Sequence, residues 1–183
     1  MTRSEAIETA EKIQGWMSRH ELEWLYDHAE KSSSVVEIGS WRGRSTYAML
    51  ASGVTTLFSV DHWHGSPSEI NDCHSDAKTR DIHAEFRASV GSFPNLIVIR
   101  NDSETASRSF EDGSVDMVFI DGEHTPEAVE RDVKAWLPKT KKLLCGHDRT
   151  MPGVAQFLKT NPFPWKEGAG SIWYYEIKQG DPS

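Results

Sequence analysis

The chain has 183 residues, of which 37% are hydrophobic, so it has about the length of one domain and can bury one substantial core. Its 28 acidic residues exceed its 20 basic residues, and a formal charge of -8 would repel a nucleic-acid backbone, so no nucleic-acid partner is expected. Cys73 and Cys145 are too few for a disulfide framework and lack the spacing of a zinc site, which indicates a reducing compartment. Since the chain shows neither a signal pattern nor an apolar run long enough to span a bilayer, we expect no membrane partner and a soluble, cytoplasmic protein.

The amino-terminal part of the chain carries a helical pattern. Between residues 5 and 30, apolar side chains recur at three- and four-residue spacing among charged ones, which predicts two amphipathic helices interrupted near residues 15–20. Trp16 and Trp24 lie on these segments and are expected in the core, as is Trp136 further along the chain. Residues 1–32 are therefore expected to add helices to a single domain that covers residues 1–183.

From residue 35 onwards, short β-rich runs alternate with helix-sized segments. The predicted strands are 35–38, 56–60, 96–99, 115–120, 142–145 and 171–177, and the predicted helices are 45–52, 82–89, 126–137 and 154–159. Thr125 as the N-cap and Pro126 at the first helical position form a start signal for one of these helices. The alternation is typical of an α/β fold with a mostly parallel sheet and helices on both faces.

The segment 61–81 interrupts this alternation. It is polar, contains Gly, Pro and Ser, and holds His62, Trp63, His64 and His74. Connections of this length are usually either functional lids or disordered segments. We treat the segment as a candidate substrate-binding insert.

Acidic residues stand at the end of each predicted parallel strand. They are Glu37, Asp61, Asp102, Asp121 and Asp148. Although Asp is common in turns for structural reasons, a doubly wound sheet binds its ligands beyond the carboxyl ends of its strands. Acids at every one of these ends therefore predict a ligand site along this edge.

The run VVEIGSWRGRST at residues 35–46 joins the first strand to a helix. Gly39 and Gly43 allow the backbone to approach a ligand closely, and Ser45 and Thr46 can cap the helix. A dinucleotide fingerprint would need a third glycine where Trp41 stands. An acid at Glu37 would also repel a pyrophosphate, whereas it favours a cationic group.

The segment 37–45 (EIGSWRGRS) resembles motif I of the class I S-adenosylmethionine-dependent methyltransferases, of the "methyltransferase domain 24" type. The resemblance continues through DHW at 61–63, FIDGEH at 119–124, AWLP at 135–138 and GHD at 146–148, and covers roughly residues 20–177. The DGEH element followed by GHD is its most specific part. The resemblance implies a Rossmann-like, mostly parallel sheet and S-adenosylmethionine as the cofactor.

The resemblance also implies a role for individual residues. Glu37, Gly39, Ser40 and Gly43 would surround the methionine part of the cofactor, Asp61 would accept both ribose hydroxyls, and Asp102 and Ser103 would face the adenine. Trp41, Ser45 and His62 complete the expected cofactor-binding set.

Asp121, His147 and Asp148 follow two adjacent predicted strands and are expected to converge. Carboxylates and imidazole suit a divalent cation, and metal-dependent O-methyltransferases similar to this chain bind Mg²⁺ at matching positions. His147 stands where those enzymes usually have an acid, so either the preference moves toward Mn²⁺, Zn²⁺ or Fe²⁺, or His147 is not a ligand.

His124 lies three residues after Asp121, and the resemblance implies that it is the catalytic base, with Asp121 as the second catalytic residue. The alternative is a histidine that only caps the following helix. The predicted reaction is methyl transfer to a hydroxyl oxygen of a small-molecule acceptor, with sugar hydroxyls preferred over phenols and carboxylates. A nicotinamide-dependent oxidoreductase and a catalytically inactive binding protein are the alternatives, and a homo-oligomer is possible.

Overall fold

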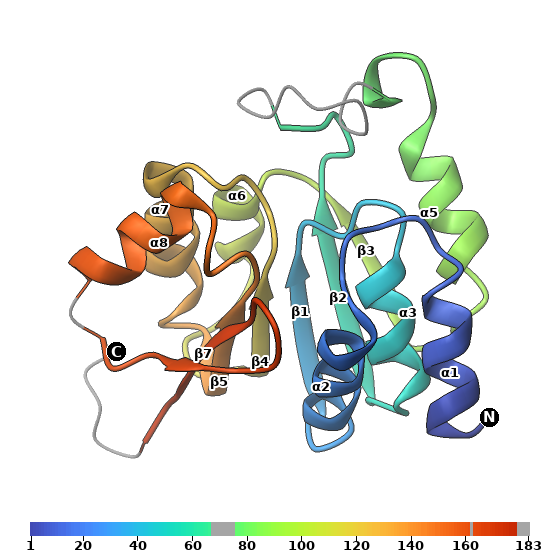
Figure 1. Cartoon of the computed structure of the whole chain (residues 1–183), viewed down its shortest axis with the longest axis horizontal. Coiled ribbons are helices and arrows are strands. Elements are labelled where there is room, and N and C mark those ends of the chain that lie inside the picture. Colours follow the sequence, from blue (N-terminus) through green and yellow to red (C-terminus); the bar gives the residue numbers. More distant parts are fainter. Residues whose placement is uncertain (67–75, 162, 179–183) are drawn as a thin grey trace.

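The computed structural model describes residues 1–66, 76–161 and 163–178. Its centre is a seven-stranded sheet in the order β3-β2-β1-β4-β5-β7-β6 (Figure 1). The strands are β1 (Ser34–Ile38), β2 (Thr56–Asp61), β3 (Leu96–Arg100), β4 (Val115–Ile120), β5 (Thr140–Gly146), β6 (Lys166–Glu167) and β7 (Trp173–Glu176). The first five strands pair in parallel, whereas β7 pairs antiparallel with β5 and β6. The predicted mostly parallel sheet is confirmed.

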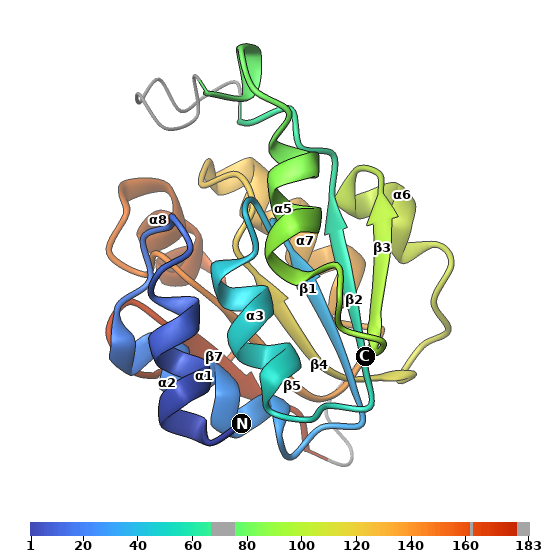
Figure 2. The same cartoon turned by 90° about the vertical axis from the view of Figure 1, so that its right-hand side faces the viewer.

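Helices cover both faces of the sheet, as the alternating pattern predicted. Figure 2 looks onto the face covered by α1 (Arg3–Ala10), α2 (Arg19–Ala29), α3 (Arg44–Ala51) and α5 (Ile82–Val90). The opposite face is covered by α6 (Ser103–Ser107), α7 (Pro126–Trp136) and α8 (Pro152–Thr160), and η1 (Asp76–Lys78) is a single 3-10 turn. Each face has its own buried apolar cluster, one around Leu25 and Met49 and the other around Val118 and Trp136. Among the described residues, no helix is both long and apolar enough to cross a membrane.

The predicted start signal of α7 is confirmed, and α2 begins with a capping arrangement that the sequence analysis did not name. The Thr125 side chain accepts a hydrogen bond from the Ala128 N–H at 3.2 Å, and Pro126 occupies the first turn of α7. At the start of α2, Ser18 and Glu21 form a capping box, in which each satisfies backbone N–H groups that the helix cannot. Local chemistry therefore fixes where both helices begin.

The prediction for Trp16 is wrong. Trp24 is partly buried and Trp136 fully buried, but the Trp16 side chain is 54% exposed. The reason is that α1 ends at Ala10 and α2 begins at Arg19, so Trp16 lies in the connection and belongs to no helical face. The helical spacing of its neighbours therefore carried no information about its burial.

The candidate insert is described only in part, because residues 67–75, with Cys73 and His74, lie outside the described residues. In the remainder, Trp63 is 3% exposed and packs against the rings of His83 and Phe86 at centroid distances of 4.6 and 5.0 Å. The start of the segment is thus fixed to α5.

The register of the parallel strands brings their carboxyl ends to one level. The Gly39 N–H donates to the Val60 carbonyl at 2.9 Å, and the Asp121 N–H donates to the Ile38 carbonyl at 2.8 Å. The His147 N–H continues the row by donating to the Ile120 carbonyl at 3.1 Å. The residues that follow β1, β2, β4 and β5 are consequently neighbours.

Substitutions at two glycines distinguish the cost of a strained backbone angle from the cost of a steric clash. Gly39 and Gly53 both have left-handed φ angles, +83° and +88°, but a Cβ on Gly39 would lie 2.2 Å from the Asp121 carbonyl oxygen, whereas one on Gly53 would meet nothing within 4 Å. We expect Gly53→Ala to cost about 1 kcal/mol of unfolding free energy through strain alone. We expect Gly39→Ala to cost about 3 kcal/mol or more, because the backbone must also move. Urea unfolding measures both, and equal losses would contradict a constraint at Gly39.

Candidate active site

A cavity of about 610 Å³ lies at the carboxyl edge of the sheet. Most of the predicted site residues line it: Gly39, Ser40, Trp41, Ser45, Asp61, His62, Asp102, Ser103, Asp121, His124, His147 and Asp148. Glu37 and Gly43 are not part of its wall. Residues 14–17, from the connection between α1 and α2, close one side.

Glu37 is fully buried beneath the cavity. Its carboxylate accepts hydrogen bonds from the Ser45 hydroxyl at 2.6 Å and from the Thr46 hydroxyl. Burial raises the pKa of Glu37 to about 7, although the hydroxyls of Ser45, Thr46 and Ser40 act in the opposite direction. Its contacts join β1 to the first turn of α3, and its role toward a cofactor stays a prediction.

The expectation that Ser45 and Thr46 cap α3 is not met. The N-cap is Gly43, whose φ of +91° is left-handed, and no side chain caps this helix end. Ser45 and Thr46 lie inside the first turn and face β1, where their hydroxyls donate hydrogen bonds to the carboxylate of Glu37. A negative group near a helix N-terminus is also favoured by the helix dipole.

Asp61 organises the loop that follows β1. Its Oδ2 accepts hydrogen bonds from the backbone N–H groups of Ser40 and Trp41 at 3.0 and 2.9 Å, and its Oδ1 accepts one from Trp63 N–H at 2.6 Å. Each carboxylate oxygen can accept about two hydrogen bonds. Oδ2 is therefore saturated, and Oδ1 keeps capacity for a ligand hydroxyl.

Three further predicted residues lie along the cavity wall. His62 is exposed, stacks on His64 with ring centroids 5.5 Å apart, and accepts the His64 N–H at 3.0 Å. Asp102 is exposed and is the N-cap of α6, where its side chain accepts the Thr105 N–H at 2.8 Å. The Ser103 hydroxyl accepts a hydrogen bond from Trp136 Nε1 at 2.9 Å, which ties this end of the cavity to α7.

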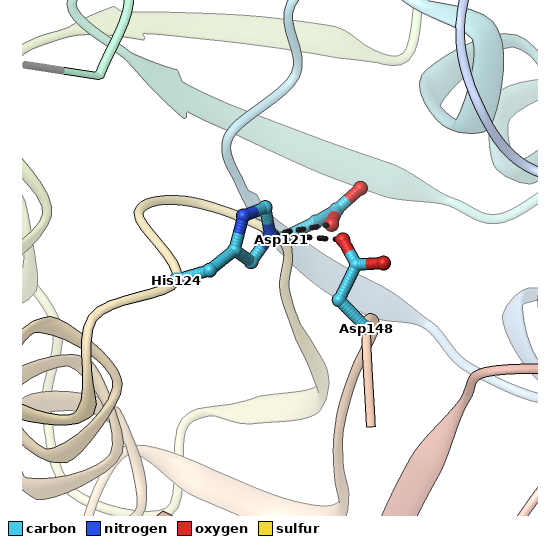
Figure 3. Close-up of side chains that lie close together, drawn as sticks. All are labelled: Asp121, His124 and Asp148. Carbon is cyan, nitrogen blue, oxygen red and sulfur yellow. Dashed lines mark ion pairs between the residues drawn. The ribbon is translucent and has the colours of Figure 1, made fainter. Parts of the chain in front are cut away.

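An acid and imidazole cluster occupies the ends of β4 and β5. His124 Nε2 lies 3.0 Å from Asp148 Oδ2 and 3.7 Å from Asp121 Oδ1 (Figure 3). The imidazole of His124 and the Asp148 carboxylate thus point toward one another from separate loops. The pKa of Asp148 is lowered far below its usual value because hydrogen bonds and charge from His124 and His147 outweigh its burial.

His147 is held between carboxylates on two sides. Its Nδ1 lies 3.2 Å from Asp148 Oδ2 and 3.6 Å from Asp121 Oδ1, and its Nε2 lies 3.1 Å from Glu21 Oε1. Burial alone would lower the pKa of His147, but Asp121, Asp148 and Glu21 together raise it to about 10. A carboxylate can only accept, so a protonated imidazole that donates from both nitrogens satisfies all of these contacts.

Glu21 is a site residue that the sequence analysis missed. Its Oε1 also accepts the Ser171 N–H at 2.7 Å, and its Oε2 accepts the backbone N–H and the hydroxyl of Ser18 at 2.6 and 2.7 Å. Burial would raise the pKa of Glu21, but these donors and His147 lower it to about 2. The Ser-x-x-Glu spacing at residues 18–21 is a visible capping signal, although it gives no sign of a partner on β5.

Asp121, His124 and Asp148 are the described residues that could hold a metal ion, because one ligand atom from each lies within 4.8 Å of the other two. The predicted ligand set had His147 in place of His124. Both ring nitrogens of His147 face carboxylates, which leaves no lone pair for a metal when the ring is protonated. The geometry therefore favours His124 as the imidazole of any metal set.

Part of the cavity wall is aromatic, with Trp16 and Trp41 among its residues. Trp41 has a φ of +47° and its ring centroid lies 6.3 Å from that of the exposed Trp16. Asp148 also has a left-handed φ, +56°. Such conformations cost about 1–2 kcal/mol each outside glycine and concentrate at functional sites.

Both the sequence and the fold match known proteins. The family described as "Methyltransferase domain" matches residues 36–148. The protein y4gI of Sinorhizobium fredii is 28% identical over an alignment 177 residues long, which covers 86% of this chain and only 19% of that relative. The present chain thus corresponds to a small part of y4gI.

Solved structures share the fold. The SAH-bound methyltransferase PaMTH1 of Podospora anserina is 15% identical, with a TM-score of 0.65 over 94% of this chain and 86% of that one. A proposed caffeoyl-CoA O-methyltransferase of Staphylococcus aureus is 14% identical, with a TM-score of 0.59 over 97% and 92%. At such low identity these similarities concern the fold alone.

Glu37 gives the stability of the protein a pH dependence. Its pKa rises from 4.5 to about 7 on folding, so the folded state holds the proton more tightly between these values and loses stability as the pH rises through them. The full effect is about 3 kcal/mol. We expect Glu37→Gln, which stays neutral, to gain about this amount relative to the parent between pH 4.5 and 8. Urea unfolding across this range measures it, and a difference that does not change with pH would contradict the assignment.

Removing Glu21 should destabilise the protein strongly. Glu21→Ala leaves the buried imidazole of His147 without its Nε2 partner, which we expect to cost about 3–5 kcal/mol of unfolding free energy. Glu23 on the same helix makes partly exposed ion pairs with Arg3 and Arg19, so Glu23→Ala should cost less than about 1 kcal/mol. Urea unfolding of both variants gives the comparison, and similar losses would show that the Glu21 pair contributes little.

Proposed function

Since the chain belongs to the methyltransferase domain family, we propose that it transfers a methyl group from S-adenosylmethionine to a hydroxyl oxygen of a small molecule. The observation that carries the hydroxyl acceptor is the cluster of Asp121, His124 and Asp148 in the cavity wall. Methyl transfer to oxygen needs a group that removes the hydroxyl proton, and an imidazole paired with a carboxylate is suited to this task. The O-methyltransferase description of the Staphylococcus aureus neighbour supports the same acceptor atom.

The residues along β1 and β2 fit the cofactor. Gly39 passes so close to the Asp121 backbone that a Cβ would collide with it. Asp61 fixes the loop of Ser40 and Trp41 by accepting hydrogen bonds from their backbone N–H groups. Asp61 Oδ1 retains an accepting position for a ribose hydroxyl. When bound, S-adenosylmethionine supplies a methyl group that its sulfonium charge has already activated.

His124 is the proposed base. Its imidazole takes the proton of the acceptor hydroxyl, and the Asp148 carboxylate, 3.0 Å from Nε2, stabilises the imidazolium that forms. Asp121 adds a second negative charge at 3.7 Å. His147 contacts Asp148 and is itself paired with Glu21, so the carboxylate that pairs with the base has a fixed orientation.

A metal-assisted version of this reaction rests on the same cluster. Asp121, His124 and Asp148 have the donors that Mn²⁺ accepts, and Mg²⁺ suits the two carboxylates. A divalent cation at this place would make the acceptor hydroxyl more acidic. His124 would then be a ligand instead of the base, so the two versions predict different responses to a chelator.

The aromatic wall suggests where the acceptor lies. Trp16 and Trp41 face the cavity from the side of residues 14–17, and Trp16 exposes more than half of its surface. Aromatic rings give apolar contact area to a ring-shaped ligand, and the carboxylates across the cavity accept hydrogen bonds from its hydroxyls. This combination supports a hydroxylated ring, such as a sugar or a catechol, as the acceptor.

The proposal is tested first by cofactor binding. Titration calorimetry on the full chain should detect S-adenosylhomocysteine and no NAD, because Trp41 stands where a dinucleotide site needs glycine. Transfer from labelled S-adenosylmethionine to methyl glycosides and catechol should then fall by about 10²-fold or more in His124→Asn, with the affinity for S-adenosylhomocysteine unchanged.

His20→Asn is the matched control, because His20 is exposed on α2 and outside the cavity wall. Transfer that survives EDTA assigns His124 as the base, whereas loss with EDTA and recovery with Mn²⁺ would assign it to metal binding. Binding of NAD in place of S-adenosylhomocysteine would overturn the proposal in favour of an oxidoreductase. Cofactor binding without transfer to any acceptor of this panel would argue for a binding protein.

A further inference from the structure

Asp132 is a buried acid that the proposed reaction does not use. It lies in the middle of α7 and its side chain is 4% exposed. Its neighbours on the buried face of this helix are apolar, namely Ala128, Val129, Val133 and Trp136. Its Oδ1 has no hydrogen-bond partner within the described parts of the chain. A buried oxygen without a partner costs free energy, so packing alone does not account for a carboxylate here.

Asp132 belongs to the wall of the cavity, together with Asp102, Ser103 and Gly122. A Cβ on Gly122 would lie 3.5 Å from Asp132 Oδ2, in direct contact with the carboxylate. Glycine at this position therefore leaves space beside the acid. Burial raises the pKa of Asp132 to about 6, so near pH 8 the group is ionised and can only accept hydrogen bonds.

The order of the strands shows which part of the cofactor this acid meets. The cluster of Asp121, His124 and Asp148 lies beyond β4 and β5, so the reactive end of the cofactor belongs there. Asp102 and Ser103 follow β3, at the other end of the same sheet edge. An elongated cofactor laid along this edge therefore places its purine beside Ser103, and Ser103 is joined to α7 through Trp136.

We propose that Asp132 determines the specificity for the cofactor's base, by accepting a hydrogen bond from the exocyclic amino group of adenine. This inference rests on the proposed use of S-adenosylmethionine. On the adenine edge the 6-amino group donates, while the ring nitrogens only accept, so the amino group is the one partner that a carboxylate can have there. A 6-oxo purine has an acceptor in place of the amino group, so the hydrogen bond to the carboxylate is lost and two acceptors oppose each other.

The test compares S-adenosylhomocysteine with its 6-oxo analogue, S-inosylhomocysteine, by titration calorimetry near pH 8. The parent protein should bind the adenine compound at least about tenfold more tightly. Asp132→Asn offers both a donor and an acceptor, so the two affinities should come within about threefold of each other. Asp132→Ala should lose the preference as well.

Glu130→Gln is the matched control, since Glu130 forms an ion pair with Lys134 on the outer side of α7, and this variant should keep the preference of the parent. Thermal unfolding separates a binding role from a structural one. If Asp132 serves binding, Asp132→Asn should be at least as stable as the parent, because it removes a buried charge whose Oδ1 is unpaired.

Each result bears on a different statement. No binding of either compound by the parent would overturn the proposed function itself. Equal binding of both compounds by the parent, or an unchanged preference in Asp132→Asn, would overturn only the role of Asp132. If Asp132→Asn is less stable than the parent and its affinities for both compounds fall equally, Asp132 has instead a structural role in positioning Ser103. If one of the two Asp132 variants fails to fold, the other still reports whether the preference depends on this residue.

Discussion

The buried pair of Glu21 and His147 holds together parts of the chain that no local interaction would join. The two residues are 126 positions apart, and their side chains meet at 3.1 Å between α2 and the end of β5. Gly170, with a φ of +55°, passes so close that a Cβ would lie 2.4 Å from Glu21 Oε1. The amino-terminal helices, the parallel sheet and the turn before β7 are therefore packed around one carboxylate. The same pair orients Asp148, so the fold and the proposed chemistry depend on a common contact.

Glu21 and Glu37 show how donors decide the state of a buried acid. Glu21 receives an imidazole and two backbone N–H groups, and its pKa falls to about 2. Glu37 receives hydroxyls, which are weaker partners for a full charge, and its pKa rises to about 7. One acid is therefore a fixed anion that holds a cationic imidazole, whereas the other can take up a proton near neutral pH. Neither behaviour follows from residue type, because both are buried glutamates.

The sequence was informative where the determining interactions are local. The β-rich runs and helical patterns located most strands and helices to within a few residues, and Thr125 with Pro126 marked the start of α7, whereas α6 and β6 were not predicted. Four of the five acids at the strand ends, all but Glu37, line one cavity, because register brings parallel strand ends to the same level. The partner of Glu21, the exposure of Trp16 and the unpaired oxygen of Asp132 were not predictable in this way. Each depends on segments that are distant in the sequence and meet only in the folded chain.

The distribution of charge around the cavity restricts the acceptor more than the fold does. Arg42 lines the wall, but its guanidinium is paired with Asp76 and Glu85, and Arg44 Nη1 donates to the carbonyls of Glu11 and Ile13. The carboxylates of Asp121 and Asp148 face the space where the acceptor would lie. An anionic acceptor would meet these acids and draw little charge from Arg42 and Arg44, which already have partners, whereas a neutral ring with hydroxyl groups can donate to the acids. This arrangement of charge favours an uncharged acceptor for the proposed reaction.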